Sequence, residues 1–148
     1  MADEMALLVA DVFEAAGALR RSGEALAATE GQTQARWQLL SAVSGGPLTV
    51  AQAARRLGVA RQGVQRIAND LVGEELAAFR TNPDHRSSPL LELTASGHRI
   101  LNKITDRATE MHRAMAADLT PAELAAARAL LQRVIEQVRR YDEGAPAT

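Results

Sequence analysis

The sequence contains no cysteine, which excludes disulfide bonds, thiolate metal ligands and thiol-based redox sensing. Aromatic residues make up only 3% of the chain while alanine and leucine are abundant, a balance that favours helices over sheets. No apolar run reaches the length of a membrane span, and the acidic Asp3 and Glu4 stand where a signal peptide needs basic residues. We therefore expect a cytoplasmic, mainly helical protein that makes no membrane contact.

The charges are unevenly distributed along the chain, although the formal net charge is only -1. Residues 1–30 hold six acidic side chains against two arginines, whereas residues 31–86 hold arginine and no lysine against four acidic side chains. The arginines of this middle third are Arg36, Arg55, Arg56, Arg61, Arg66, Arg80 and Arg86. Because arginine makes bidentate contacts to phosphate and guanine that lysine cannot reproduce, this segment is the candidate for binding nucleic acid.

Apolar residues recur at helical spacing over most of the chain. The predicted helices cover about residues 3–28, 33–43, a short stretch ending near Leu57, 61–72 and 95–117, with a last helix beginning at Pro121. Residues 76–80 and 90–93 have the pattern of two short strands, joined by a polar loop rich in turn residues. A helix pair followed by a hairpin is the winged form of the helix-turn-helix. The predicted fold class is therefore mainly α with a small β-hairpin wing.

Two helix starts carry a specific capping pattern. Thr49 and Gln52 are spaced as a capping box, in which each side chain bonds the backbone N–H of the other residue. Thr120 precedes Pro121 and Glu123, which places a cap, a proline at the first helical position and an acid at the third. Both patterns predict well-defined helix starts.

The segment from Ala53 to Ile67 meets the packing needs of a helix-turn-helix. Ala54 is small enough for a close helix crossing, and Gly58 supports the positive φ of the turn. Val64 and Ile67 lie on the inner face of the second helix, which leaves a polar outer face. Arginine reads guanine there and amides read adenine, so the candidate DNA-reading residues are Arg61, Gln62, Gln65, Arg66 and Asn69.

The hairpin tip carries Asp84, His85 and Arg86, with Arg80 at its base. An arginine on such a wing can enter the minor groove, and Asp84 is expected to hold Arg86 in one rotamer through a hydrogen-bonded pair. Two other interpretations stay open: a helical bundle whose polar face is merely solvated, and a winged-helix interaction module that does not read DNA by itself. Replacement of Arg86 by alanine distinguishes the interaction module from a DNA-binding protein. The substitution should cut the DNA affinity of a DNA-binding protein sharply and have no effect on an interaction module.

The first and last helices have more apolar surface than one winged domain can cover. Leu124, Leu131 and Val138 recur every seven residues, which suits helix packing between subunits. We expect a homodimer with dimerisation helices in residues 1–31 and 95–148 around a winged helix-turn-helix domain at 32–94. Its two recognition helices would read half-sites of double-stranded DNA about 10 bp apart.

Sequence motifs of enzymes and metal sites are absent. There is no glycine-rich phosphate loop, no Gly-x-Ser-x-Gly elbow and no His-Glu-x-x-His pair. His98 and His112 lie on one predicted helix about 21 Å apart, so they cannot ligate one ion together, and His85 is on the wing. We expect no catalytic residues, no cofactor and no metal.

The chain resembles the MarR family of multiple-antibiotic-resistance regulators over about residues 6–141. The resemblance is carried by Leu57 to Arg66, by Asn82 to Ser87 and by Leu91 to Gly97, and the wing segment is the most specific of these. It implies a DNA-binding repressor that is a dimer through its first and last helices. It also implies Asp84 and Arg86 as a wing pair and a small aromatic or acidic effector.

The resemblance places the effector between the dimerisation helices and the DNA-binding lobe, where Phe13, Arg36 and Trp37 are the candidates. Three residues depart from the family pattern. Ala60 stands in place of a frequent serine cap, and His85 in place of a common arginine, which implies weaker phosphate contact at neutral pH than in acid. Glu75 stands in place of a glycine, which predicts a helix end nearer Gly73.

Overall fold

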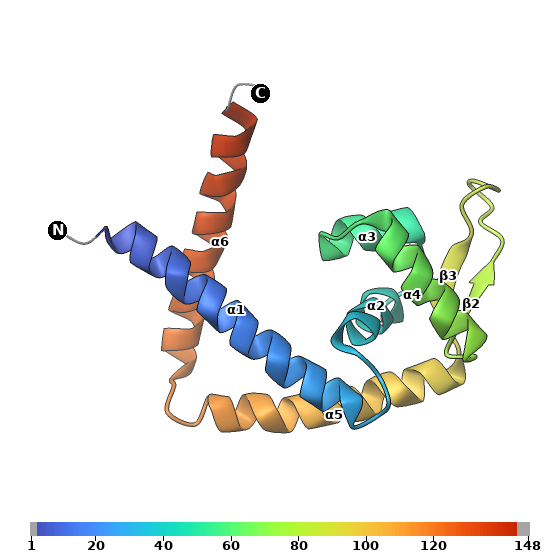
Figure 1. The fold of residues 1–148 in the computed structure, drawn as a ribbon, viewed down its shortest axis with the longest axis horizontal. Helices are drawn as coiled ribbons and strands as arrows, with labels where there is room; N and C mark the ends of the chain where they lie inside the picture. Colours follow the sequence, from blue (N-terminus) through green and yellow to red (C-terminus); the bar gives the residue numbers. More distant parts are fainter. Residues whose placement is uncertain (1–2, 145–148) are drawn as a thin grey trace. The chain divides into compact units, whose positions relative to one another are not determined.

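The computed structural model describes residues 3–144 and confirms a mainly helical fold with a small antiparallel sheet (Figure 1). In chain order the elements are α1 (Glu4–Ala28), α2 (Gln34–Ser44), β1 (Leu48–Thr49), α3 (Val50–Leu57), α4 (Arg61–Gly73), β2 (Ala77–Arg80), β3 (Leu90–Leu93), α5 (Ala95–Met115) and α6 (Pro121–Gly144). The chain forms two compact units that divide between Thr109 and Glu110. The expected division into three functional parts is a separate matter and stays a prediction.

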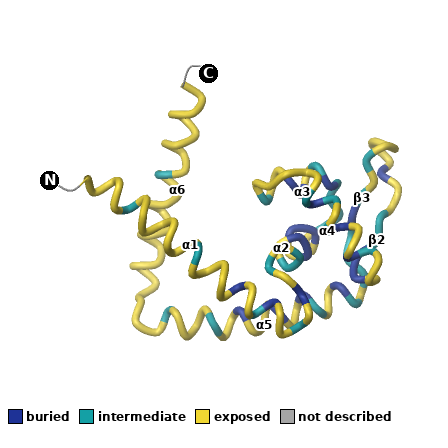
Figure 2. The backbone as a smooth tube through the Cα atoms, in the orientation of Figure 1, coloured by how far each residue is buried: buried dark blue, intermediate teal, exposed yellow. Residues whose placement is uncertain are grey.

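The core lies among α2, α3, α4 and the sheet. Leu39 and Leu40 of α2, Leu71 of α4 and Leu91 of β3 are almost completely buried. Burying a leucine side chain stabilises a fold by about 1.5–3 kcal/mol, so this cluster fixes α4 against α2 and the sheet. The dark segments in Figure 2 concentrate in these elements, whereas α1 and α6 are exposed along most of their length.

The sheet has the strand order β1-β3-β2 with antiparallel pairing throughout. The buried Leu91 stands opposite Leu48 on one side and opposite Phe79 on the other. The hairpin of β2 and β3 was predicted, but β1 was not. Because β1 is only two residues long and pairs with a strand some forty residues later, it leaves no alternating pattern in the sequence.

The expected helix boundaries are confirmed where local chemistry sets them. Thr49 Oγ1 accepts from the Gln52 N–H at 3.1 Å and Gln52 Oε1 accepts from the Thr49 N–H at 2.9 Å, which completes the capping box. Gly58 ends α3 with a φ of 68°. Glu123 N–H donates to Thr120 Oγ1 at 3.1 Å at the start of α6. Ala60 provides no side-chain cap for α4, because its methyl group cannot accept a hydrogen bond.

The end of α4 agrees with the expectation drawn from Glu75, because the helix stops at Gly73. Glu75 nevertheless takes the left-handed backbone that glycine favours, with a φ of 61°. Its carbonyl accepts from Thr94 Oγ1 at 2.7 Å, which holds the turn in place. The turn therefore keeps its left-handed backbone although a glutamate, and not a glycine, occupies the position.

The substitution Glu75→Gly is expected to stabilise the protein by about 0.5–1 kcal/mol. A left-handed residue with a side chain costs about 1–2 kcal/mol, and the freer unfolded chain of glycine offsets part of the gain. Urea unfolding followed by circular dichroism measures the difference. Glu75→Ala is the control, since it removes the charge but keeps the strained backbone, and it should give no gain. Equal stabilisation by both variants would contradict the assignment of strain to Glu75.

Candidate nucleic-acid interface

Helix α4 presents a polar face to solvent. Val64, Ala68 and Leu71 are buried against the core on its inner side. The candidate reading residues lie on the remaining surface: Arg61, Gln62, Arg66 and Asn69 are exposed and Gln65 is half-buried. The structure thus brings together the five side chains that the sequence assigned to one helix face.

Two of these side chains are bonded to each other. The Gln65 amide nitrogen Nε2 donates to Asn69 Oδ1 at 3.0 Å. The two residues are one helical turn apart, the spacing at which side chains on a helix surface meet. By contrast, neither Arg61 nor Arg66 takes part in any of the ion pairs formed within residues 3–144, so both guanidinium groups are available to an external anion.

The wing loop is closed by Asn82, the residue before Pro83 in the turn-rich segment. Asn82 is 7% exposed, and its Nδ2 donates to the Ser88 carbonyl at 3.0 Å across the loop. Its Oδ1 accepts from the Asp84 N–H at 3.0 Å, a bond that asparagine commonly makes to the backbone two residues on. Burial of an amide that is bonded at both its nitrogen and its oxygen fixes the wing loop. The Asn-Pro pair in the sequence was the signal for it.

The expected ion pair between Asp84 and Arg86 does not form within residues 3–144, and the DNA-binding role of the two residues stays a prediction. Four ion pairs form within the described chain, and they join Arg36 to Glu74, Arg80 to Glu92, Arg107 to Glu30 and Arg140 to Glu136. Asp84 and Arg86 are both exposed. An exposed pair gains about 0–1 kcal/mol and loses side-chain entropy, so solvent competes successfully for both groups. The hydroxyl of Ser87 instead lies 2.8 Å from His85 Nδ1.

A small recess of about 60 Å³ lies where α4 meets the wing. Arg61 and Gln65 line it from α4, and Ser87 and Ser88 line it from the wing. Thr49, Val50, Ala51 and Pro89 complete the wall. Side chains of the candidate reading helix and of the wing therefore lie beside each other around one recess.

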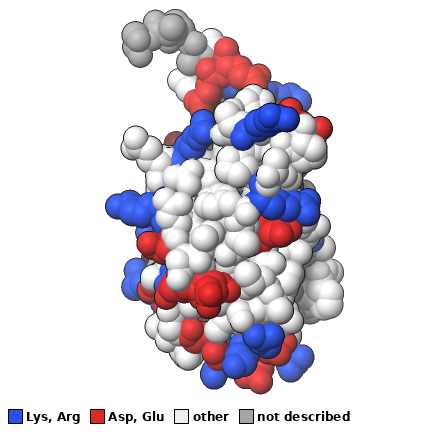
Figure 3. Space-filling model, turned by 90° about the vertical axis from the view of Figure 1, so that its right-hand side faces the viewer, with Lys and Arg blue, Asp and Glu red and all other residues white. Residues whose placement is uncertain are grey.

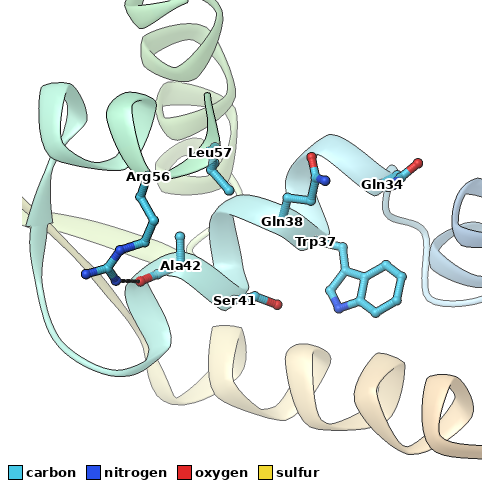
Figure 4. A pocket seen from close by; sticks show the side chains of 7 residues that line it. All are labelled: Gln34, Trp37, Gln38, Ser41, Ala42, Arg56 and Leu57. Carbon is cyan, nitrogen blue, oxygen red and sulfur yellow. Dashed lines mark hydrogen bonds between the residues drawn. The ribbon is translucent and has the colours of Figure 1, made fainter. Parts of the chain in front are cut away.

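A larger cavity of about 470 Å³ lies between α2 and α3 (Figure 4). Its lining residues are Gln34, Trp37, Gln38, Ser41, Ala42, Arg56 and Leu57. Arg56 Nη1 donates to the Ala42 carbonyl at 3.2 Å, and the buried Gln34 Oε1 has no hydrogen-bond partner. Of the three effector candidates, Trp37 lines this cavity. Phe13 is 74% exposed on α1, and Arg36 pairs with Glu74, so neither contributes to it.

The face of the molecule shown in Figure 3 carries charges of both signs. On the side of the molecule shown in Figure 3, basic and acidic side chains are interspersed among a larger area of neutral residues. This agrees with the net charge of -1. DNA affinity in such a protein depends on a few well-placed arginines and on the number of phosphates contacted, because counterion release scales with that number.

A helix-turn-helix followed by a two-stranded wing, with a third short strand beside it, defines the winged helix-turn-helix class of proteins. The profile of the MarR family matches residues 31–86 of the chain. One similar solved structure is that of a mutant of the Escherichia coli protein MarR with operator DNA. It superposes with a TM-score of 0.79 at 21% identity, over 88% of this chain and 95% of its own.

Two further similarities extend along the chain. An uncharacterized protein of Mycobacterium tuberculosis is 64% identical over 135 residues, which cover 91% of this chain and 94% of the relative. The regulator PcaV of Streptomyces coelicolor, solved with its natural ligand, has a TM-score of 0.68 at 25% identity over 82% of this chain and 89% of its own. The chain belongs to the MarR family of winged helix-turn-helix transcriptional regulators, a family of regulators and not of enzymes.

Between residues 3 and 144, no helix combines the length and the apolar character that crossing a bilayer needs.

Proposed function

We propose that the protein is a transcriptional repressor that binds a pseudo-palindromic operator as a homodimer. The observation that carries the proposal is the solvent-facing polar side of α4, which lies beside a wing held closed by the buried Asn82. Arginine and amide side chains on this face have the donors and acceptors that distinguish base pairs in the major groove. The MarR structure solved with operator DNA supports this use of the shared fold.

The dimer is proposed from the unburied apolar surface of α6. None of its residues is buried, although Leu130, Leu131, Ile135 and Val138 are apolar and 41–51% exposed. In α1, Leu7 and Leu19 are each 49% exposed and Phe13 is 74% exposed. Large apolar surfaces of this kind on soluble proteins mark association sites. A second copy of the chain covers them in the proposed assembly, with two recognition helices one DNA turn apart.

The double substitution Leu131→Asp/Ile135→Asp is expected to produce a monomer with at least 100-fold weaker operator binding. Two buried carboxylates at an apolar interface are strongly unfavourable, and a monomer keeps only half of the phosphate contacts. Sedimentation equilibrium measures the mass, and fluorescence anisotropy measures affinity for an operator recovered from random DNA. Ala129→Asp/Gln132→Asp is the charge-matched control on the side of α6 that carries Glu136, and it should remain dimeric. A dimeric Leu131→Asp/Ile135→Asp variant would show that α6 is not the interface.

We infer further that a small effector molecule occupies the cavity between α2 and α3 and changes DNA affinity. Trp37 provides an aromatic surface there, and Arg56 provides a cation for an acidic group. The PcaV structure with its natural ligand supports ligand binding within this fold. An effector acts only if it binds one arrangement of the two recognition helices better than the other. Trp37 is the one tryptophan of the chain, so its fluorescence reports occupancy of the cavity directly.

A further inference from the structure

We propose that Gln65 and Asn69 act together as one composite reader that selects adenine at a single position of each half-site. This inference rests on the proposed function, because it names the base that the same helix face recognises. The observation behind it is the hydrogen bond from Gln65 Nε2 to Asn69 Oδ1, 3.0 Å long. No other bond between two side chains of α4 forms in the described structure.

The bond orients both amides before DNA arrives. Gln65 is half-buried and Asn69 is exposed, so the pair extends from the protein surface outward. A free glutamine or asparagine samples several rotamers, and fixing them on binding costs side-chain entropy. In the bonded pair that ordering is already present in the free protein. A preoriented pair discriminates between bases better than two independent amides do.

The groups left free by the bond define the preferred base. Gln65 Oε1 remains as an acceptor and Asn69 Nδ2 remains as a donor. In the major groove adenine offers an N6 amino donor beside the N7 acceptor, which complements both groups. Guanine offers two acceptors, thymine an acceptor and a methyl group, and cytosine a donor. If the two amides exchange donor and acceptor, one acceptor and one donor again remain, so the preference for adenine is unchanged.

The test measures binding to operator duplexes in which each half-site position carries each of the four base pairs in turn. The wild-type protein should prefer adenine at one position by about 10- to 100-fold, the discrimination of a good bidentate contact. Asn69→Ala should abolish the preference at that position. Asn69→Asp still accepts the Gln65 bond but replaces the free donor by an acceptor, so the preference should move to cytosine, whose N4 amino group donates.

The matched control is Gln52→Glu, which adds the same negative charge on the neighbouring helix. A glutamate accepts the Thr49 N–H as Gln52 does, so the capping box and the fold are kept. This control should weaken binding to all duplexes by the same factor and leave the adenine preference in place. A sequence preference that is insensitive to changes at Asn69 overturns the composite reader but leaves the proposed function standing. Absence of any sequence preference in the wild-type protein overturns both.

Discussion

Replacement of Gly97 by alanine is expected to destabilise the winged domain by about 3 kcal/mol, at the upper end of the usual cost of overpacking. Gly97 lies in the first turn of α5 and is buried against the end of the turn before β2. A Cβ atom at this position would overlap the carbonyl oxygen of Leu76 and meet the carbonyl carbon at 3.0 Å. The obstacle is backbone, so a change of rotamer cannot relieve it.

The Leu76 carbonyl cannot move aside because its neighbours hold it. It accepts from the Thr94 N–H at 3.1 Å, and Thr94 Oγ1 donates to the Glu75 carbonyl at 2.7 Å. The Gly97 N–H in turn donates to Thr94 Oγ1 at 3.1 Å. These bonds join the start of α5 to the turn between α4 and β2. A shift of α5 away from Leu76 therefore breaks the contacts that position the wing.

Urea unfolding of Gly97→Ala measures this effect, and Gly63→Ala is its matched control. A Cβ on Gly63, inside α4, meets nothing within 4 Å, so the same chemical change should stabilise the protein by about 1 kcal/mol through helix propensity. The two variants are expected to shift stability in opposite directions. Similar shifts in both would mean that the close packing of α5 on Leu76 is not a determinant of the fold.

The substitution Arg86→Ala is expected to weaken operator binding about 10-fold or more without changing the stability of the free protein. Arg86 is exposed on the wing and has no ion-pair partner within residues 3–144, so its removal leaves no internal group unsatisfied. Loss of a cation from a narrow minor groove or from a phosphate contact costs roughly 1–3 kcal/mol of binding. The slope of log affinity against log salt should also become less steep by about 1.8, because the dimer loses one phosphate contact at each of its two wings.

Anisotropy titrations at several salt concentrations measure both quantities. Arg133→Ala, which removes an exposed arginine from the side of α6 that carries Glu136, serves as the control and should leave operator affinity unchanged. Intact binding by Arg86→Ala would mean that the wing does not touch DNA. That result would move the interpretation toward a winged-helix module that acts by contacting another protein.

The parts of the fold that the sequence predicted are those set by local chemistry. The capping box at Thr49, the left-handed Gly58 and the apolar face of α4 each depend on residues within one or two helical turns. The hairpin was predicted because its two strands flank a polar loop. β1 was missed because its pairing with β3 depends on residues distant in the chain.

The candidate interface was predictable in its residue types but not in its internal bonds. Arginine and amide residues on one face of α4 follow from helical periodicity. Whether Asp84 bonds to Arg86 or remains in solvent depends on loop geometry, which the buried Asn82 determines. The cavity beside Trp37 was likewise not predictable in its full lining, because Arg56 reaches it only through the packing of α3 on α2.

The most direct test of the proposed function is selection of bound duplexes from a random DNA pool by the purified protein at physiological salt. We expect recovery of a pseudo-palindrome whose half-sites lie about 10 bp apart, one for each recognition helix of the dimer. Recovery of no common motif would contradict the proposed function. The MarR fold would then belong to a protein that does not read DNA by itself.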